Sequence, residues 1–238
     1  MKLFAGIALS FAVLFGAEEA KRPDPFFIQE NQLVYHTTAY PEEGTGVDVE
    51  AFLRIRSAVK QGDKVVSEGE LGYGNEGSSI TWTYRVRFAC DSLNFYVHAG
   101  NWLYEPVRKD QEVSATYESD SLVYPLTMKV NDSLPPAYAK RSYSSKATQD
   151  ITTMKFTDRK VVSLDTVETG FGIRTAYHIR MKVRTESDYV VSPGRNRDNG
   201  ISYVVNEWFI PSIGIVRTEY TIAGTGSYKI VMQKYKAG

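Results

Sequence analysis

The chain of 238 residues carries 28 basic and 28 acidic side chains, so its formal net charge is zero. No overall field attracts such a protein to nucleic acid or to an anionic membrane, and we expect no nucleic-acid partner. With 42% hydrophobic and 13% aromatic residues, the length suits one large all-β domain or two small ones.

The first twenty residues have the pattern of a secretory signal peptide. A short cationic start precedes an apolar run from Leu3 to Phe15, and small and acidic residues follow it. The apolar run is too short to span a bilayer. We predict a signal peptide over residues 1–20, cleaved after Ala17 or Ala20, and a periplasmic or secreted protein; an uncleaved anchor is the alternative.

Cys90 is the only cysteine of the chain. The mature protein therefore has no internal disulfide, and no cysteine follows the apolar run as the acceptor of a lipid anchor. Its stability must come from the core, which a chain of this length can build. Because Cys90 ends an alternating run, we expect a small buried side chain rather than a nucleophile.

Alternation of period two predicts strands along most of the mature chain. The predicted strands cover residues 32–38, 46–57, 64–73, 81–90, 93–98, 113–118, 151–158, 160–168, 176–185, 200–210 and 226–235. About a dozen short strands separated by turn residues indicate an all-β fold, an antiparallel β-barrel or half-barrel, with a two-sheet β-sandwich as the alternative. No shift in composition marks a boundary, so we predict a single antiparallel β domain over residues 21–238, without a transmembrane span.

Two polar segments are predicted to be loops. Residues 135–150 show no clear alternation and at most a weak helical tendency over residues 137–148, and residues 192–200 are rich in Gly and Asn. Segments of this kind run over protein surfaces and are predicted to be mobile at their tips.

The segment from Trp208 to Tyr220 predicts a hairpin. Trp208 and Phe209 load its first arm with aromatic area, Pro211 ends that arm because it has no N–H for a ladder, and Gly214 supplies an unusual turn dihedral. We expect this hairpin to close the sheet, with Trp208 and Phe209 sealing the interior and Trp208 essential for folding.

Two groups of side chains are candidates for binding. The many aromatic residues can line a cavity for an apolar ligand, although aromatic residues also fill ordinary β cores. The candidates for a ligand cavity or the core are Trp82, Tyr84, Phe88, Tyr177, Trp208, Tyr220 and Tyr228. A second set could form a basic face that binds lipid phosphate or another anion, although zero net charge favours a solvated exterior with interleaved acids. This set is Arg54, Arg56, Arg85, Arg87, Arg180, Lys182 and Arg184.

No motif with the spacing of a metal, phosphate or nucleophile site occurs. The three histidines, His36, His98 and His178, lie far apart along the chain, and no Gly-x-Ser-x-Gly elbow or phosphate loop is present. We therefore predict no cofactor, no metal ligand and no catalytic residue, and lean against an enzyme.

Four segments resemble a family of exported β proteins of Gram-negative envelopes, labelled TapB-like or classed as a domain of unknown function. The first segment is Tyr-Arg-Val-Arg-Phe-Ala-Cys-Asp over residues 84–91, followed by Leu-Asn-Phe-Tyr-Val over residues 93–97. The second is Tyr-Pro-Leu-Thr-Met-Lys-Val-Asn-Asp-Ser-Leu-Pro over residues 124–135. Val-Glu-Thr-Gly-Phe-Gly-Ile-Arg-Thr-Ala-Tyr and the Trp208–Tyr220 hairpin complete the set. Asn131 stands where the family usually has Gly, and Gly170-Phe171 where it has Pro-Ala, so these two turns depart from its pattern. The resemblance implies a barrel or half-barrel akin to periplasmic lipoprotein carriers, and it transfers no catalytic residue.

The sequence thus favours a non-enzymatic periplasmic protein that binds an apolar or lipid-like ligand and serves envelope maintenance. A structural or interaction protein of the envelope, with an envelope protein as its partner, is the alternative. A hydrolase of an envelope polymer is a third possibility, and it requires a cleft with two convergent carboxylates.

Overall fold

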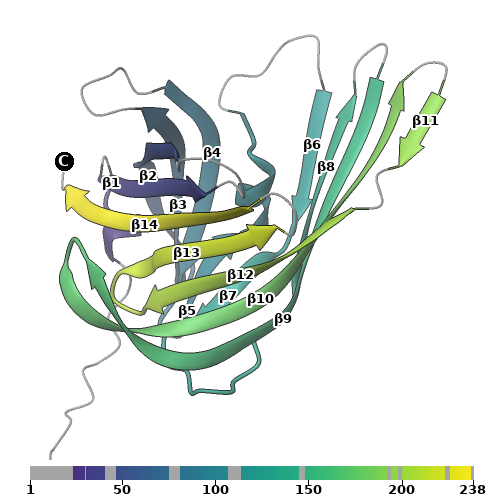
Figure 1. Cartoon of the computed structure of the whole chain (residues 1–238). Helices are drawn as coiled ribbons and strands as arrows, with labels where there is room; N and C mark the ends of the chain where they lie inside the picture. The colour runs from purple at the N-terminus through teal and green to yellow at the C-terminus, as the bar shows by residue number, and fades with distance from the viewer. Residues whose placement is uncertain are drawn as a thin grey trace, which may run out of the picture.

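The computed structural model of the chain is a strongly curved antiparallel sheet (Figure 1). It describes residues 24–29, 31–40, 47–74, 81–106, 114–144, 148–191, 194–197, 200–222 and 226–236. The predicted signal segment, residues 1–20, lies outside them. No helix in the described part of the chain has the length and apolar character needed to cross a membrane.

Fourteen strands of the described residues form one sheet. Its order is β6 (Ser114–Ser119), β8 (Ala137–Ser144), β9 (Thr148–Thr169), β10 (Gly172–Val191), β12 (Ile201–Ile210), β13 (Gly214–Ile222), β14 (Gly226–Lys236), β1 (Gln32–Tyr40), β2 (Val47–Gln61), β3 (Lys64–Gly74), β4 (Thr81–Cys90), β5 (Asn94–His98) and β7 (Ser121–Pro125). The short β11 (Gly194–Arg197) pairs with β10 outside this order. Two 3₁₀ turns complete the described elements, η1 (Asp24–Phe27) and η2 (Ala99–Leu103).

The sheet is a half-barrel, because its edge strands β6 and β7 are not paired with each other. This confirms the predicted antiparallel all-β class and excludes a closed barrel. The two edges are nevertheless joined through Asp120, which separates them in the chain. Its backbone oxygen accepts from the Ala99 N–H at 3.0 Å, and its N–H donates to the Tyr138 oxygen at 3.0 Å. One residue thus holds both edges at the seam.

A buried arginine bridges the seam at a second point. Asp158 has a positive φ of 51°, and a bulge in β9 places Asp158 and Arg159 opposite the single residue Met181. The bulge turns Arg159 into the interior, where Nη1 donates to the Pro135 oxygen at 2.8 Å and Nη2 to the Val123 oxygen at 3.2 Å. The guanidinium therefore satisfies carbonyl groups that a closed ladder would pair.

The turn η2 covers the free part of the β4 edge. Asn101 places its side-chain amide against the backbone of Arg87: Oδ1 accepts from the Arg87 N–H at 2.9 Å, and Nδ2 donates to the Arg87 oxygen at 3.0 Å. Further along, the Arg85 N–H donates to the backbone oxygen of Glu105 at 2.7 Å. The amide side chain thus imitates a neighbouring strand and leaves η2 fixed at the mouth of the half-barrel.

One end of the half-barrel is filled by aromatic rings. Phe95 stacks on Phe88 and on Phe209, with centroids 6.0 Å and 5.9 Å apart. Phe26 of η1 meets Phe88 edge-on at 4.9 Å, and Tyr124 lies 5.3 Å from Phe209. All five side chains are buried. This end is therefore a packed core rather than a channel.

Most predicted strands are present, and two predicted loops are wrong. Residues 135–150 contain β8, and residues 192–200 contain β11. The buried positions of β8 are Ala137 and Ala139, which are too small to give a visible hydrophobic alternation. The segments predicted over residues 151–158 and 160–168 are one strand, β9, because the bulge at Asp158 interrupts the alternation but not the pairing.

Candidate ligand cavity

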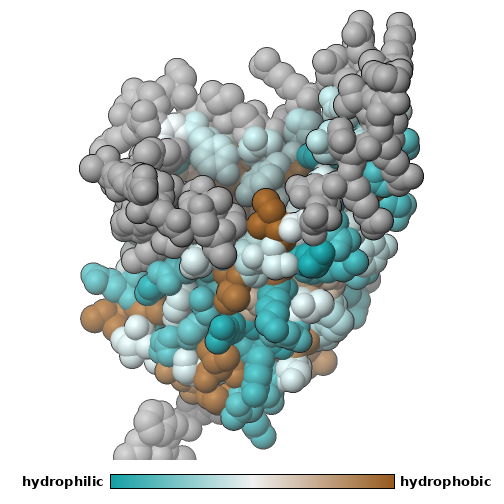
Figure 2. Space-filling view, turned by 45° about the vertical axis from the view of Figure 1, so that its right-hand side comes forward, coloured by the Kyte–Doolittle hydropathy of each residue, from teal (hydrophilic) through white to brown (hydrophobic). Residues whose placement is uncertain are grey.

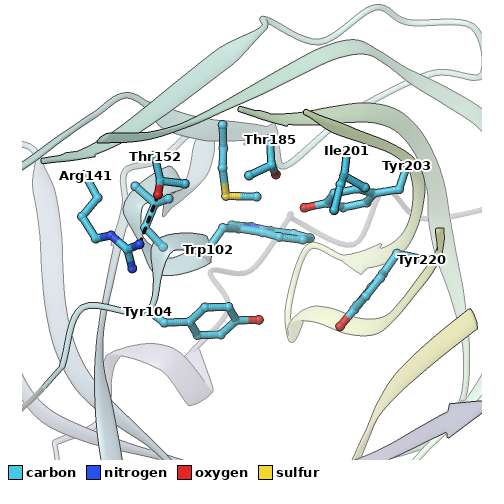
Figure 3. A pocket seen from close by; sticks show the side chains of 10 residues that line it. Trp102, Tyr104, Arg141, Thr152, Thr185, Ile201, Tyr203 and Tyr220 are labelled. Carbon is cyan, nitrogen blue, oxygen red and sulfur yellow. Dashed lines mark hydrogen bonds between the residues drawn. The ribbon is translucent and has the colours of Figure 1, made fainter. Parts of the chain in front are cut away.

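A cavity of about 300 Å³ lies between η2 and the curved sheet (Figure 3). Its lining residues Ile201 and Tyr203 are near the start of β12, whereas Phe209 of the aromatic core is near the end of that strand. Its lining comes from η2, from Tyr104 beyond it and from five strands, β8, β9, β10, β12 and β13. The lining residues are Trp102, Leu103, Tyr104, Arg141, Thr152, Met154, Thr185, Ile201, Tyr203 and Tyr220. Most of this surface is aromatic or aliphatic, and the polar groups are few.

Strand register places the wall residues side by side. Met154 of β9 pairs with Thr185 of β10, which in turn pairs with Ile201 of β12. One step toward β8, Arg141 pairs with Thr152. Since paired residues of neighbouring strands point to the same face, these side chains form a continuous inner wall.

The floor and one rim of the cavity come from η2. The Trp102 ring packs edge-on against the buried Phe156, with centroids 5.5 Å apart, so it separates the cavity from the interior below. Tyr104 follows the turn with a left-handed φ of 54°. This uncommon conformation for a bulky residue turns the chain and directs the phenol over the cavity, as Figure 3 shows.

Tyrosine rings stand on both sides of the opening. Tyr104 lies against Tyr84, with centroids 5.0 Å apart, and Tyr84 meets Tyr73 at 6.3 Å. On the opposite wall Tyr203 and Tyr220 are 6.0 Å apart. Burial raises the pKa of Tyr73, of Tyr104 and of Tyr203 above the usual phenol value. These phenols therefore stay protonated at neutral pH and act as hydrogen-bond donors with apolar bodies.

Arg141 is the one cation among the lining residues. Its Nη2 donates to Asp150 Oδ2 at 3.0 Å and to Thr152 Oγ1 at 3.1 Å, which fixes the guanidinium at the wall. Its Nε is buried and has no acceptor, and no acceptor for Nη1 lies among the described residues. The cavity therefore has an oriented cationic group with unused donors at one side.

The chain matches the DUF3108-like family over residues 30–222. This match covers most of the chain. The chain belongs to the DUF3108-like family. A comparison with curated proteins gave no match.

Two solved structures share the fold of this DUF3108-like protein. One is described as a candidate exported protein with a YmcC-like fold from Bacteroides fragilis; it is 17% identical, with a TM-score of 0.56, over 90% of this chain and 100% of that one. The other is a candidate lipoprotein from Parabacteroides distasonis, 17% identical, with a TM-score of 0.59, over 89% of this chain and 99% of that one. At this identity the likeness concerns the fold alone.

The sequence-based candidates for a cavity or core lie in three places. Tyr220 lines the cavity, Tyr84 packs against its rim, and Phe88 belongs to the aromatic core. The Tyr177 hydroxyl accepts from the Met128 N–H at 3.3 Å, away from the cavity. The side chains of Trp82 and Tyr228 lie outside the described part of the DUF3108-like domain.

Trp208 lies on the opposite face of the sheet from Phe209. Phe209 is in the aromatic core, whereas the Trp208 ring stacks on His178 at 4.5 Å, with the Arg217 guanidinium over it at 4.2 Å. Its indole N–H donates to Asp165 Oδ2 at 2.8 Å. Trp208 is thus buried and part of the hydrophobic cluster, but its ring packs on the face of the sheet opposite Phe209, because adjacent strand residues point to opposite faces.

The outer cluster around Trp208 brings Ser, His and Asp together without the arrangement of a catalytic triad. Ser163 Oγ lies 3.2 Å from His178 Nδ1, and Asp165 Oδ2 lies 3.2 Å from the same nitrogen. The other ring nitrogen, Nε2, lies 3.0 Å from Asn206 Oδ1. A triad needs the carboxylate on one ring nitrogen and the hydroxyl on the other. Here the contacts hold the imidazole flat against Trp208.

The candidate basic residues fall into two separated groups. Arg54, Arg56, Arg85 and Arg87 lie on β2 and β4, on either side of β3. In register, Glu70 of β3 lies between Arg54 and Arg85, and Glu68 is opposite Arg87. Acidic side chains thus alternate with basic ones across these three strands.

The second basic group is on β10, which four strands separate from β2 in the sheet. Its members are Arg180, Lys182 and Arg184. Lys182 Nζ lies 2.9 Å from Asp158 Oδ2, and Arg184 Nε lies 2.7 Å from Glu186 Oε1.

In the described part of the face in Figure 2, hydrophobic residues are scattered between hydrophilic ones.

Several cavity residues escaped the sequence-based selection. Met154, Thr185 and Tyr203 lie in predicted strands, so their inward direction could have been found from the alternation. Trp102 and Tyr104 lie in and after a 3₁₀ turn, where no periodicity exists to indicate a face. Which strands adjoin this turn depends on long-range pairing, which a single sequence does not display.

Proposed function

We propose that this DUF3108-like protein binds a lipid-like ligand on the concave side of its half-barrel. The observation that carries the proposal is the cavity of about 300 Å³, lined mainly by aromatic and aliphatic side chains next to a buried hydrophobic core. Pockets with an apolar wall and a few convergent polar groups are typical of small-molecule sites. A purely structural domain of this size has no need to leave such a wall unfilled.

The proposal places the protein in the bacterial envelope, where it serves envelope maintenance. The apolar segment from Leu3 to Phe15 suits a signal peptide over residues 1–20 followed by a single domain over residues 21–238. The two structural neighbours are described as a candidate exported protein and a candidate lipoprotein, which agrees with export. The TapB-like label within the DUF3108-like family stays a prediction.

Extraction of the purified protein tests the binding function. The chain should be expressed with its signal segment, purified without detergent and extracted with organic solvent for mass spectrometry. We expect a co-purified lipid-like compound. The variant Ile201→Trp should lose most of it, since Ile201 stands at the cavity wall with 49% of its surface exposed and can grow without disturbing the core.

Ile173→Trp is the matched control. Ile173 is 67% exposed at the turn between β9 and β10 and is not a lining residue. The variant Ile173→Trp adds the same indole ring away from the cavity and should leave the amount of extracted lipid-like compound unchanged. An extract without apolar compounds, together with no binding of an added fluorescent acyl probe, contradicts the proposal.

A further inference from the structure

We propose that the ligand is a single-chain amphiphile with an anionic headgroup, a carboxylate or a phosphate, whose oxygen atoms bind Arg141. This inference rests on the proposed function and adds the number of chains and the chemistry of the headgroup. The number of chains follows from the volume of the cavity and from its closed floor. The second follows from the hydrogen-bonding capacity left at its wall.

The cavity accommodates one chain. Its volume of about 300 Å³ is at the lower end of the range for small-molecule sites, roughly 300–1,000 Å³. It cannot deepen into the core, because Trp102 closes it against the buried Phe156, and Leu103 and Met154 are themselves almost fully buried. A lipid with two or three acyl chains would leave apolar surface in water, whereas one chain can be covered.

Arg141 has donors for which the described residues supply no acceptor. Asp150 and Thr152 both accept from Nη2, which holds the guanidinium in place and leaves Nη1 without an acceptor in that part of the chain. Nη1 is the group open to a ligand oxygen, and charge-assisted bonds from arginine to carboxylate or phosphate are among the strongest in proteins.

Asp150 limits the electrostatic attraction at this point. Its ion pair with Arg141, at 3.0 Å, offsets much of the positive charge, and Glu105 nearby is paired with Arg87 at 2.8 Å. The preference for an anion therefore comes from directed donors at short range rather than from a long-range field. We expect it to survive moderate salt for this reason.

The tyrosine phenols extend the donor set along the opening. Tyr104, Tyr203 and Tyr220 direct ring faces and hydroxyl groups toward the cavity (Figure 3). An amphiphile seated with its chain against Trp102 and Met154 passes these rings where its apolar part gives way to its polar part. Phenols are suited to such a boundary because one end is apolar and the other is a hydrogen-bonding group.

Calorimetric titration with four amphiphiles of equal chain length tests the headgroup. The purified, delipidated protein is titrated with dodecanoate, dodecyl phosphate, dodecyl maltoside and dodecyltrimethylammonium, each below its micelle concentration. We expect one of the two anions to bind at one per chain and at least about tenfold more tightly than the neutral and cationic compounds. The comparison of dodecanoate with dodecyl phosphate distinguishes the two headgroups.

Arg141→Gln should weaken binding of the preferred anion about tenfold to a hundredfold and leave dodecyl maltoside unchanged. Arg180→Gln, an exposed position of β10 outside the cavity, is the matched control and should change neither. Urea unfolding of both variants checks that each is folded. Equal binding of anionic and neutral compounds, or equal weakening of both by Arg141→Gln, overturns the headgroup assignment while the cavity remains a binding site.

A second comparison tests the number of chains. Vesicles of phosphatidylglycerol, which has two chains, should lose no lipid to the protein, whereas its single-chain lyso form should bind at one per chain. Stoichiometric extraction of the two-chain lipid overturns the single-chain assignment. If none of these compounds binds, and Ile201→Trp behaves as the unchanged protein does, the proposed function itself fails together with this inference.

Discussion

Gly214 occupies a backbone position that is restricted in two ways. Its φ of +101° is one that L side chains rarely adopt, and an added Cβ would lie 2.4 Å from Cε2 of Phe26. Phe26 is part of the aromatic core, so it has little room to move. The predicted hairpin thus needs glycine for its turn and also for the packing of η1.

The variant Gly214→Ala should therefore lower the free energy of unfolding by about 2–4 kcal/mol, from backbone strain and overpacking together. Urea unfolding measures the change. The control is Gly62→Ala, at a φ of +65° with open space around it, which should cost only the strain of about 1–2 kcal/mol. Equal losses in both variants would show that contact with Phe26 contributes nothing.

Glu207 is a fully buried acid beside the aromatic core, and the Tyr124 hydroxyl donates to it at 2.7 Å. Burial raises the pKa of Glu207, while the hydrogen bond from Tyr124 and the charge of Arg159 act in the opposite direction. The folded protein therefore keeps its proton at a pH where the unfolded chain has released it. Stability should fall as the pH rises above about 4.5, the ordinary value, until the raised pKa is passed.

Glu207→Gln should remove this fall, because the amide cannot ionise and can still accept from Tyr124. Urea unfolding at several pH values between 4 and 8 measures it, and Glu118→Gln, an exposed position of β6, is the control. Above pH 4.5 the unfolding free energy of Glu118→Gln should fall with pH as that of the unchanged protein does, whereas the unfolding free energy of Glu207→Gln should fall less. Parallel curves would mean that Glu207 ionises alike in the folded and the unfolded protein.

At the scale of elements, the weak point of the fold is the seam between β6 and β7. Arg159 satisfies the Pro135 and Val123 carbonyl groups there and lies 5.0 Å from the Tyr124 ring centre. Arg159→Met removes both hydrogen bonds and leaves the two carbonyl groups without this donor. We expect a loss of about 1–3 kcal/mol for each carbonyl group that stays buried without a partner.

Hydrogen exchange locates the effect of Arg159→Met. Faster exchange should be concentrated in β7 and the segment from Leu126 to Pro136, with β13 and β14 changed little, since they stand in the middle of the strand order, far from both edges. Arg180→Met, an exposed position on β10, is the control for loss of a cation on the same hairpin. A uniform rise in exchange throughout the sheet would contradict a local role at the seam.

The elements of the sheet differ in how far the sequence predicts them. Alternating runs such as residues 81–90 and 176–185 are predictable because large side chains fill every second position. β8 is not, because its inward positions hold alanines, and the continuity of β9 depends on the backbone conformation of Asp158. The seam of the half-barrel depends on contacts of Asp120 and Arg159 with segments distant in the sequence, which a single sequence does not display.

The type of candidate site was predictable from the sequence, but most of its lining residues were not. An aromatic-lined cavity was among the expectations, and Tyr220 was selected for it. Trp102, Tyr104 and Arg141 were not, because each lies in a segment without a strand-like pattern. Trp208 shows a different difficulty: alternation separates it from Phe209 by face, but it does not show which face is outside, where His178 and Arg217 cover the Trp208 ring.

At the scale of the whole molecule, the half-barrel divides into a packed end and a hollow end. The stacked rings of Phe88, Phe95 and Phe209 lie at the packed end, whereas the cavity wall at the other end carries partly exposed side chains. Stability and binding should therefore be separable by mutation. Regions that bind ligands often have lower local stability than the core that supports them.

The comparison of Phe209→Ala with Ile201→Ala tests this division. Phe209 is fully buried in the aromatic core, so its truncation should cost about 3–5 kcal/mol of unfolding free energy. Ile201 is about half exposed at the cavity wall, so its truncation should cost less than about 0.5 kcal/mol. In the acyl-probe assay the order should reverse: Ile201→Ala weakens binding, while Phe209→Ala, measured at low temperature where it remains folded, binds nearly as the unchanged protein does. If both variants lose stability and binding in proportion, the two ends form one cooperative unit, and the cavity is a part of the core that happens to be underpacked.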